Sequence, residues 1–208
     1  MIAIAGGKGG CGKTTTTACL ARALATQGDN PIVVDGDCDM PDLHVLAGVP
    51  VTPGLAEFTR GAPLDDVTHG AVELPGVDVL PAGHGDSDDL DRAAGSLTGC
   101  RRPVLVDTPA GASPAVATVI RAADGVIIVT TATRESLEDA TKTAAIARTV
   151  ETPILGSVVT NCNGGTDPST LLGCQTLAHV PTVDSPLTAT CVRECYVRVA
   201  TAMKKRNI

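Results

Sequence analysis

Aromatic side chains are almost absent from this sequence of 208 residues, which has no tryptophan, one tyrosine and one phenylalanine. Hydrophobic residues nevertheless make up 43% of the chain, so a core has to be built from valine, isoleucine, leucine and alanine. A chain of this length can bury such a core within one domain. We therefore expect residues 1–208 to form a single domain.

The sequence also lacks a long apolar segment. No hydrophobic run approaches the roughly 20 residues of a membrane-spanning helix, and a strand-like segment begins at residue 2, which leaves no room for a signal peptide. Basic residues are outnumbered, since the formal net charge is −7, and strong DNA binding depends on clustered lysine and arginine. We expect a cytoplasmic protein that does not bind DNA strongly.

Cysteine is plentiful, but its usual metal-binding motifs are missing. None of the eight cysteines lies in a C-x-x-C or C-x-C motif. The closest pair, Cys191 and Cys195, has the i, i+4 spacing of a helix, where two thiols can share a metal or pack as small apolar groups. We favour packing for both, and the sequence leaves a metal role open.

One glycine-rich stretch organises the chain. Residues 7–14 read GKGGCGKT and match G-x-x-x-x-G-K-[ST], between an apolar segment at 2–5 and a helical pattern at 14–26. Glycines let backbone N–H groups turn toward phosphate oxygens, and the helix adds its positive N-terminal end. Lys13 is then expected at the β- and γ-phosphates, with the Thr14 hydroxyl on Mg²⁺. The further nucleotide contacts expected from this loop are Gly9, Gly10, Cys11, Gly12 and Thr15.

Two other apolar segments, at 31–35 and 103–107, each end in an aspartate. Acids at the carboxyl ends of parallel strands beside such a loop face the bound phosphates. Asp107 is therefore a candidate to hold Mg²⁺ through water or the Thr14 hydroxyl. The first segment, which ends in Asp35, leads into a loop that carries three more carboxylates, beginning with Asp37.

The remaining pattern alternates strands and helices. Further strand-like segments occur at 77–80, 125–130 and 154–160, and helical patterns at 86–97, 136–150 and 185–205. About seven strands in such an alternation predict an α/β fold, a doubly wound and mainly parallel sheet of the P-loop NTPase type. Helices would cover both faces, and the site would lie at the carboxyl edge.

Three segments together resemble the MinD/ParA family of deviant Walker A ATPases, the SIMIBI class. KGGCGKTT at 8–15 resembles the family's phosphate loop, the D-x-D-x-x-x-P-x-L-H pattern at 35–44 its switch I segment, and DTPAG at 107–111 its switch II segment. The resemblance implies ATP and Mg²⁺ as ligands and a homodimer that forms with ATP. It also implies hydrolysis to ADP and phosphate that is slow without an activating partner.

The same resemblance assigns roles to four further residues. Lys8, which an ordinary phosphate loop does not need, would reach across the dimer interface to the partner's nucleotide. Gly111 would lie near the γ-phosphate. Asn161 would hydrogen-bond the adenine edge, and Pro181 would pack near the base.

The water-positioning acid is a choice between Asp35 and Asp37. The residues alone do not separate them. The resemblance selects Asp37, which would also approach the Mg²⁺ shell, with Asp35 supporting the metal's waters.

The implied function is a switch that positions a cellular component, such as division or partition machinery, together with an activating or cargo protein. A metal or iron–sulfur carrier of the Mrp-like or nickel-insertion type is the alternative, although its C-x-x-C or C-x-C ligands are missing. A nucleotide-dependent binding module that hydrolyses little is a third possibility. The basic residues within 204–208 predict at most weak membrane contact.

Overall fold

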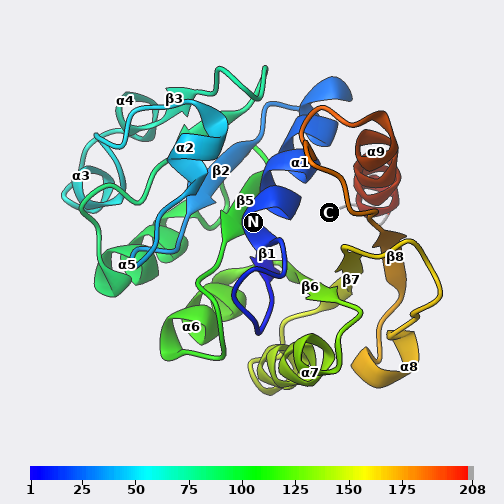
Figure 1. Cartoon of the computed structure of the whole chain (residues 1–208). Coiled ribbons are helices and arrows are strands. Elements are labelled where there is room, and N and C mark those ends of the chain that lie inside the picture. The colour runs from blue at the N-terminus through cyan, green and yellow to red at the C-terminus, as the bar shows by residue number, and fades with distance from the viewer. Residues whose placement is uncertain (206–208) are drawn as a thin grey trace.

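The computed structural model describes residues 1–205, and the strands of this part of the chain form one sheet. In chain order they are β1 (Ile2–Ala5), β2 (Ile32–Asp35), β3 (His69–Gly70), β4 (Asp78–Leu80), β5 (Val104–Asp107), β6 (Gly125–Thr131), β7 (Ile154–Thr160) and β8 (Thr176–His179). Their spatial order is β3-β4-β2-β5-β1-β6-β7-β8, and only β3 runs antiparallel to its neighbour among these strands. The central β1 has β5 on one side and β6 on the other (Figure 1). Because the chain turns to opposite sides of β1, a crevice opens at the carboxyl end of this strand.

Helices cover both faces of the sheet (Figure 1). One face carries α1 (Lys13–Thr26), α2 (Leu43–Ala47) and α9 (Thr190–Lys204), and the other carries α3 (Leu55–Thr59), α5 (Ser87–Leu97), α6 (Pro114–Ala122) and α7 (Arg134–Thr149). Two helices are short: α4 (Leu64–Val67) contacts α3, and α8 (Ser169–Leu172) contacts α7. Since both faces of the sheet are covered, the central strands β1, β2 and β5 are fully buried and read as apolar segments, with an aspartate at the end of β2 and of β5.

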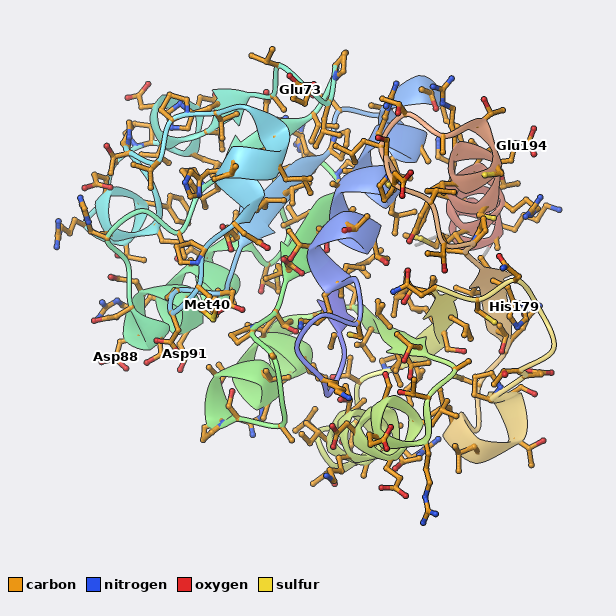
Figure 2. All side chains as sticks on the ribbon, viewed as in Figure 1. Met40, Glu73, Asp88, Asp91, His179 and Glu194 are labelled. Carbon is orange, nitrogen blue, oxygen red and sulfur yellow. The ribbon has the colours of Figure 1, made fainter. Side chains whose placement is uncertain are left out.

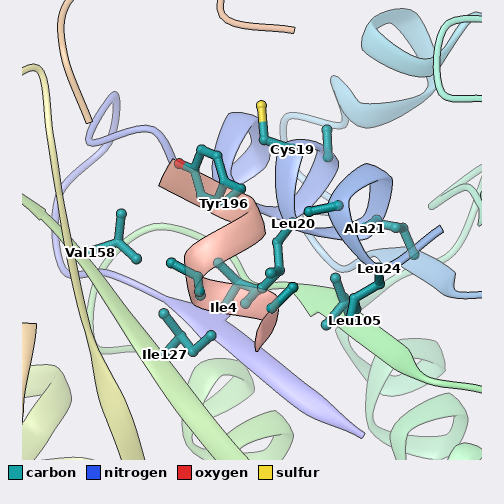
Figure 3. Packing of buried hydrophobic residues seen from close by; sticks show 14 of the residues in the cluster. Ile4, Cys19, Leu20, Ala21, Leu24, Leu105, Ile127, Val158 and Tyr196 are labelled. Carbon is teal, nitrogen blue, oxygen red and sulfur yellow. The ribbon is translucent and has the colours of Figure 1, made fainter. Parts of the chain in front are cut away.

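The core is therefore divided into two layers by the sheet. In β1, Ile4 joins the cluster under α1 and α9, whereas Ala3 and Ala5 join the cluster under α5 and α6. Both layers are mostly aliphatic, as the composition predicts. The aromatic side chain in the first layer is Tyr196 of α9, which lies against α1 (Figure 3).

The predicted α/β fold, with a doubly wound, mainly parallel sheet, is confirmed. Residues 1–205 contain eight strands, where about seven were expected, and the two-residue β3 is one that the sequence does not indicate. The prediction of a helix over 185–205 is wrong at its start, because the helix begins at Thr190. The guanidinium of Arg22 donates a hydrogen bond to the Leu187 carbonyl, so the segment before Thr190 forms a separate turn held against α1.

Near the C-terminus the structure describes only part of the basic segment, for which at most weak membrane contact is predicted. Lys204 forms an ion pair with Asp29 at 2.6 Å, while Arg206, Asn207 and Ile208 lie outside the described residues. Within residues 1–205, no helix combines the length and the apolar character needed to cross a bilayer.

Candidate functional site

The loop of residues 6–12 joins β1 to α1 at the carboxyl edge of the sheet. Gly12 has a φ of 88°, in the left-handed region that glycine adopts without steric cost. A Cβ atom on Gly7 would lie 2.3 Å from the Cβ of Asp139 in α7, whereas one on Gly9 would meet nothing within 4 Å. The base of the loop is thus packed tightly against α7, and its apex is open.

Helix α1 begins directly after this loop with no side-chain cap on its first turn. The N–H groups of that turn are therefore available to an anion, which the helix dipole also favours. A cavity of about 530 Å³ lies in front of them. Its lining residues are Gly9, Gly10, Gly12, Lys13, Thr14, Thr15, Asp37, Met40, Pro41, Asp42 and Ala110.

The two loop lysines occupy different environments. Lys13 is only 7% exposed and lines the cavity. Lys8 is exposed at the apex of the loop and does not line the cavity of its own chain. The lysine from within the subunit therefore faces the cavity, and the second lysine faces outward.

Asp107, the last residue of β5, has a free acceptor in a buried position. Its side chain is 1% exposed, Oδ1 accepts a hydrogen bond from the Thr17 hydroxyl at 3.3 Å, and Oδ2 has no partner within residues 1–205. Burial raises the pKa of Asp107 to about 7, opposed by the Thr14 hydroxyl and the Lys13 charge. Carboxylate and hydroxyl oxygens are the donors that Mg²⁺ prefers, so Asp107 and Thr14 fit a bound Mg²⁺.

Asp35 lies beside Asp107 in the register of β2 and β5 but is already engaged. Its Oδ1 accepts the backbone N–H of Asp37 at 3.2 Å, and its Oδ2 accepts that of Leu43 at 3.3 Å. Burial, and then repulsion from Asp107, raise the pKa of Asp35 to about 8. Asp35 therefore holds the segment after β2 in its conformation.

Asp37 has the more open position. It is partly buried, it lines the cavity, and its Oδ1 accepts the backbone N–H of Met40 at 3.2 Å. The Met40 side chain is 78% exposed at the end of this segment (Figure 2). Of the two acids, Asp37 is the one that borders space for a ligand.

The ends of β7 and β8 bring the two predicted base contacts near each other. Asn161 follows β7 with a φ of 49°, and the next residue, Cys162, donates its backbone N–H to the Val180 carbonyl at 3.0 Å. Pro181 follows Val180 directly. Neither Asn161 nor Pro181 lines the phosphate-side cavity, so a base contacting them would lie beside it.

Other predicted residues lie behind or beside the cavity. The Cys11 side chain is 1% exposed, so only its backbone can face a ligand. Its carbonyl accepts a hydrogen bond from the Thr160 hydroxyl at 2.6 Å, a contact that sequence reasoning missed. Gly111 does not line the cavity, but its neighbour Ala110 does.

The cysteine pair on α9 is divided between core and surface. Cys195 is buried as expected, but the packing expectation is wrong for Cys191, which is exposed because it lies on the solvent side of the helix. Among the described residues, no group of three or more His, Cys, Asp or Glu side chains is arranged to hold a metal.

Solved structures with a similar fold are known. The chain is similar to the septum site-determining protein MinD complexed with Mg-ADP from Pyrococcus horikoshii, with a TM-score of 0.85 and 24% identity. The similarity covers 99% of this chain and 96% of that one. At this level of identity the likeness shows the fold.

Curated relatives and a family description extend the comparison. An ATP-binding protein of Methanocaldococcus jannaschii is 33% identical over 193 residues, 88% of this chain and 72% of the relative. An iron–sulfur cluster carrier protein of Methanococcus maripaludis is 32% identical over 182 residues, 78% of this chain and 60% of the relative. Residues 2–181 match the family described as the CobQ/CobB/MinD/ParA nucleotide binding domain. With this match over most of its length, the chain belongs to the CobQ/CobB/MinD/ParA family.

Proposed function

We propose that this chain is a cytoplasmic ATPase switch of the MinD/ParA type, which binds ATP with Mg²⁺, dimerises, and is reset by hydrolysis. The single observation that carries the proposal is the separation of the two loop lysines. Lys13 is buried at the cavity, whereas Lys8 is exposed at the loop apex. Such a switch would position a cellular component, such as division or partition machinery, through an activating or cargo protein.

In the proposed reaction, water attacks the γ-phosphorus in line with the bond to the β-bridging oxygen. That bond breaks, and the products are ADP and phosphate. Asp37 holds the water at the cavity wall, and Lys13 offsets the charge that develops on the phosphates. Thr14 and Asp107 would hold Mg²⁺, which would supply positive charge to offset the charge that develops on the phosphates.

The position of Lys8 supports the proposed dimerisation. A cation at the loop apex lies outside its own cavity, so it contributes charge best to the nucleotide of a second copy across a two-fold axis. The γ-phosphate then supplies a buried partner for a lysine that otherwise repels its symmetry mate. Because ATP binds the dimer better than the monomer, the nucleotide shifts the equilibrium toward the dimer.

Two observations support an adenine nucleotide. Asn161 and Pro181 lie on adjacent segments beside the phosphate loop. A 33% identical relative is named as ATP-binding, and a structural neighbour is a complex with Mg-ADP.

The decisive experiment compares Lys8→Ala with the parent in light scattering, using a non-hydrolysable ATP analogue and Mg²⁺. The parent should dimerise, and the variant should bind nucleotide as a monomer and lose ATPase activity. Lys205→Ala removes an exposed lysine at the far end of α9 and serves as the matched control. A parent that stays monomeric, or a variant that dimerises and hydrolyses like the parent, contradicts the proposal.

A metal or iron–sulfur carrier is the second candidate, because one relative is named as an iron–sulfur cluster carrier and is 32% identical. Its cargo would need cysteine ligands, and the exposed Cys191 with Cys195 is the nearest pair in sequence. Anaerobic purification, metal analysis and visible spectroscopy test this candidate. A charge-transfer band that disappears in a Cys191→Ser/Cys195→Ser variant would favour the carrier over the positioning switch.

A further inference from the structure

No side chain caps the start of α1, and hydroxyl contacts from neighbouring elements hold this region in place. Gly12, its N-cap residue, has no side chain to satisfy the first-turn N–H groups, and these are the groups that a phosphate would contact. Two hydroxyl contacts described above join this region to β7 and β5. The third comes from α9, where the Tyr196 hydroxyl and the Thr16 Oγ1 lie 2.8 Å apart.

This third contact is isolated from solvent. Thr16 is fully buried. Tyr196 is 1% exposed and lies in the aliphatic layer between α1 and α9 (Figure 3). Neither hydroxyl can replace its partner with water, so each depends on the other. The Thr16 backbone N–H in turn donates to the Gly12 carbonyl at 2.8 Å. Tyr196 is therefore two hydrogen bonds away from the residue where the phosphate loop becomes a helix.

The residue before Tyr196 contacts another wall of the site. The Cys195 thiol donates to the carbonyl of His179 at 3.3 Å. His179 is the last residue of β8 (Figure 2), two positions before Pro181. Tyr196 thus contacts α1, and the preceding Cys195 contacts the end of β8, the strand that leads to Pro181.

We propose that Tyr196 is a positioning residue for nucleotide binding. Its hydroxyl fixes the first turn of α1 through Thr16, and α9 keeps this turn in register with the end of β8. The inference rests on the proposed nucleotide binding and deepens it. A tyrosine that only filled the core would be replaced by phenylalanine without consequence for the site, because phenylalanine retains the ring.

The test is a double-mutant cycle on the dissociation constant of Mg-ADP, measured by calorimetry well below the thermal unfolding midpoint of every variant. Tyr196→Phe and Thr16→Val should each weaken binding by about threefold to tenfold, because either change leaves one buried hydroxyl without a partner. The double variant should bind no more weakly than the single variants, since the pair acts as one unit. Thr16→Ser keeps the hydroxyl and should restore the parent affinity.

Thr201→Val is the control on α9, since its hydroxyl donates to the Val197 carbonyl and accepts from the Gln27 amide at the end of α1, both away from α1's first turn. It should leave the dissociation constant unchanged. If Tyr196→Phe binds Mg-ADP like the parent, or if the effects of the two single variants simply add, Tyr196 is a packing residue and the inference fails. A parent that does not bind Mg-ADP overturns the proposed function instead.

Discussion

Replacing Asp107 by asparagine should make the stability of the nucleotide-free protein less sensitive to pH. Asp107 is buried beside Asp35, and burial raises the pKa of Asp107 to about 7 from its ordinary value of 3.8. Between these two pKa values the folded protein keeps a proton on Asp107 that the unfolded chain has released. The free energy of unfolding must therefore fall as pH rises from about 4 to 7.

The magnitude follows from the two pKa values. Each pH unit between them is worth about 1.36 kcal/mol, so the parent should lose roughly 2–3 kcal/mol from this carboxyl between pH 5 and pH 8. Asparagine does not titrate and removes this loss. It also removes the negative charge that raises the pKa of Asp35, so the contribution of Asp35 should shrink as well. Any fixed cost of burying the amide is the same at both pH values and cancels.

Urea denaturation of parent and Asp107→Asn at pH 5 and pH 8, without Mg²⁺ or nucleotide, measures the difference. Asp167→Asn is the control, because hydrogen bonds from Thr176 and Ser169 lower the pKa of this exposed acid, and its titration lies below pH 5. Asp107→Asn should also bind ADP equally with Mg²⁺ or with EDTA. A free energy of unfolding that falls as steeply in Asp107→Asn as in the parent would refute the reasoning.

Three further predictions concern the loop and the base. Lys13→Ala should fold normally and lose Mg-ATP binding by at least about a hundredfold in calorimetry, because it removes the buried cation of the cavity. Gly7→Ala should lower the thermal unfolding midpoint by several degrees, since its Cβ would meet Asp139 at 2.3 Å, whereas Gly9→Ala should leave the midpoint unchanged because its Cβ meets nothing. Asn161→Ala should reduce the preference for ATP over GTP about tenfold in competition binding while retaining affinity for pyrophosphate, and equal losses for both nucleotides would argue against a base contact.

The sequence predicts the parts of the site that depend on residues adjacent in the chain. The loop at 7–14 is defined by glycine conformations and by the strand and helix around it, and Asp107 by its place at the end of an apolar segment. These signals depend on residues adjacent in the chain, so they can be recognised without the tertiary structure. The fold prediction also needs the alternation of strands and helices along the chain, and the family comes from the resemblance of three segments to MinD/ParA proteins.

The contacts that hold the site together could not be predicted in this way. The Thr160 hydroxyl and the Cys11 carbonyl are 149 residues apart, and Thr16 and Tyr196 are 180 apart. Threonine and tyrosine occur in many core positions, and nothing in their local pattern identifies a partner. The late start of α9 at Thr190 has a similar origin, because a tertiary contact to the preceding turn overrides the helical periodicity.

Because the sequence has so few aromatic residues, its one tyrosine can serve as an intrinsic fluorescence probe. With no tryptophan and one tyrosine, all tyrosine emission comes from Tyr196, whose hydroxyl hydrogen-bonds within the α1–α9 layer. Emission from a phenol depends on the hydrogen bonding of its hydroxyl, so the unlabelled protein reports on this one contact. A titration followed by fluorescence therefore observes the junction between the phosphate-loop helix and the C-terminal helix directly, with no engineered dye and no background from a second site.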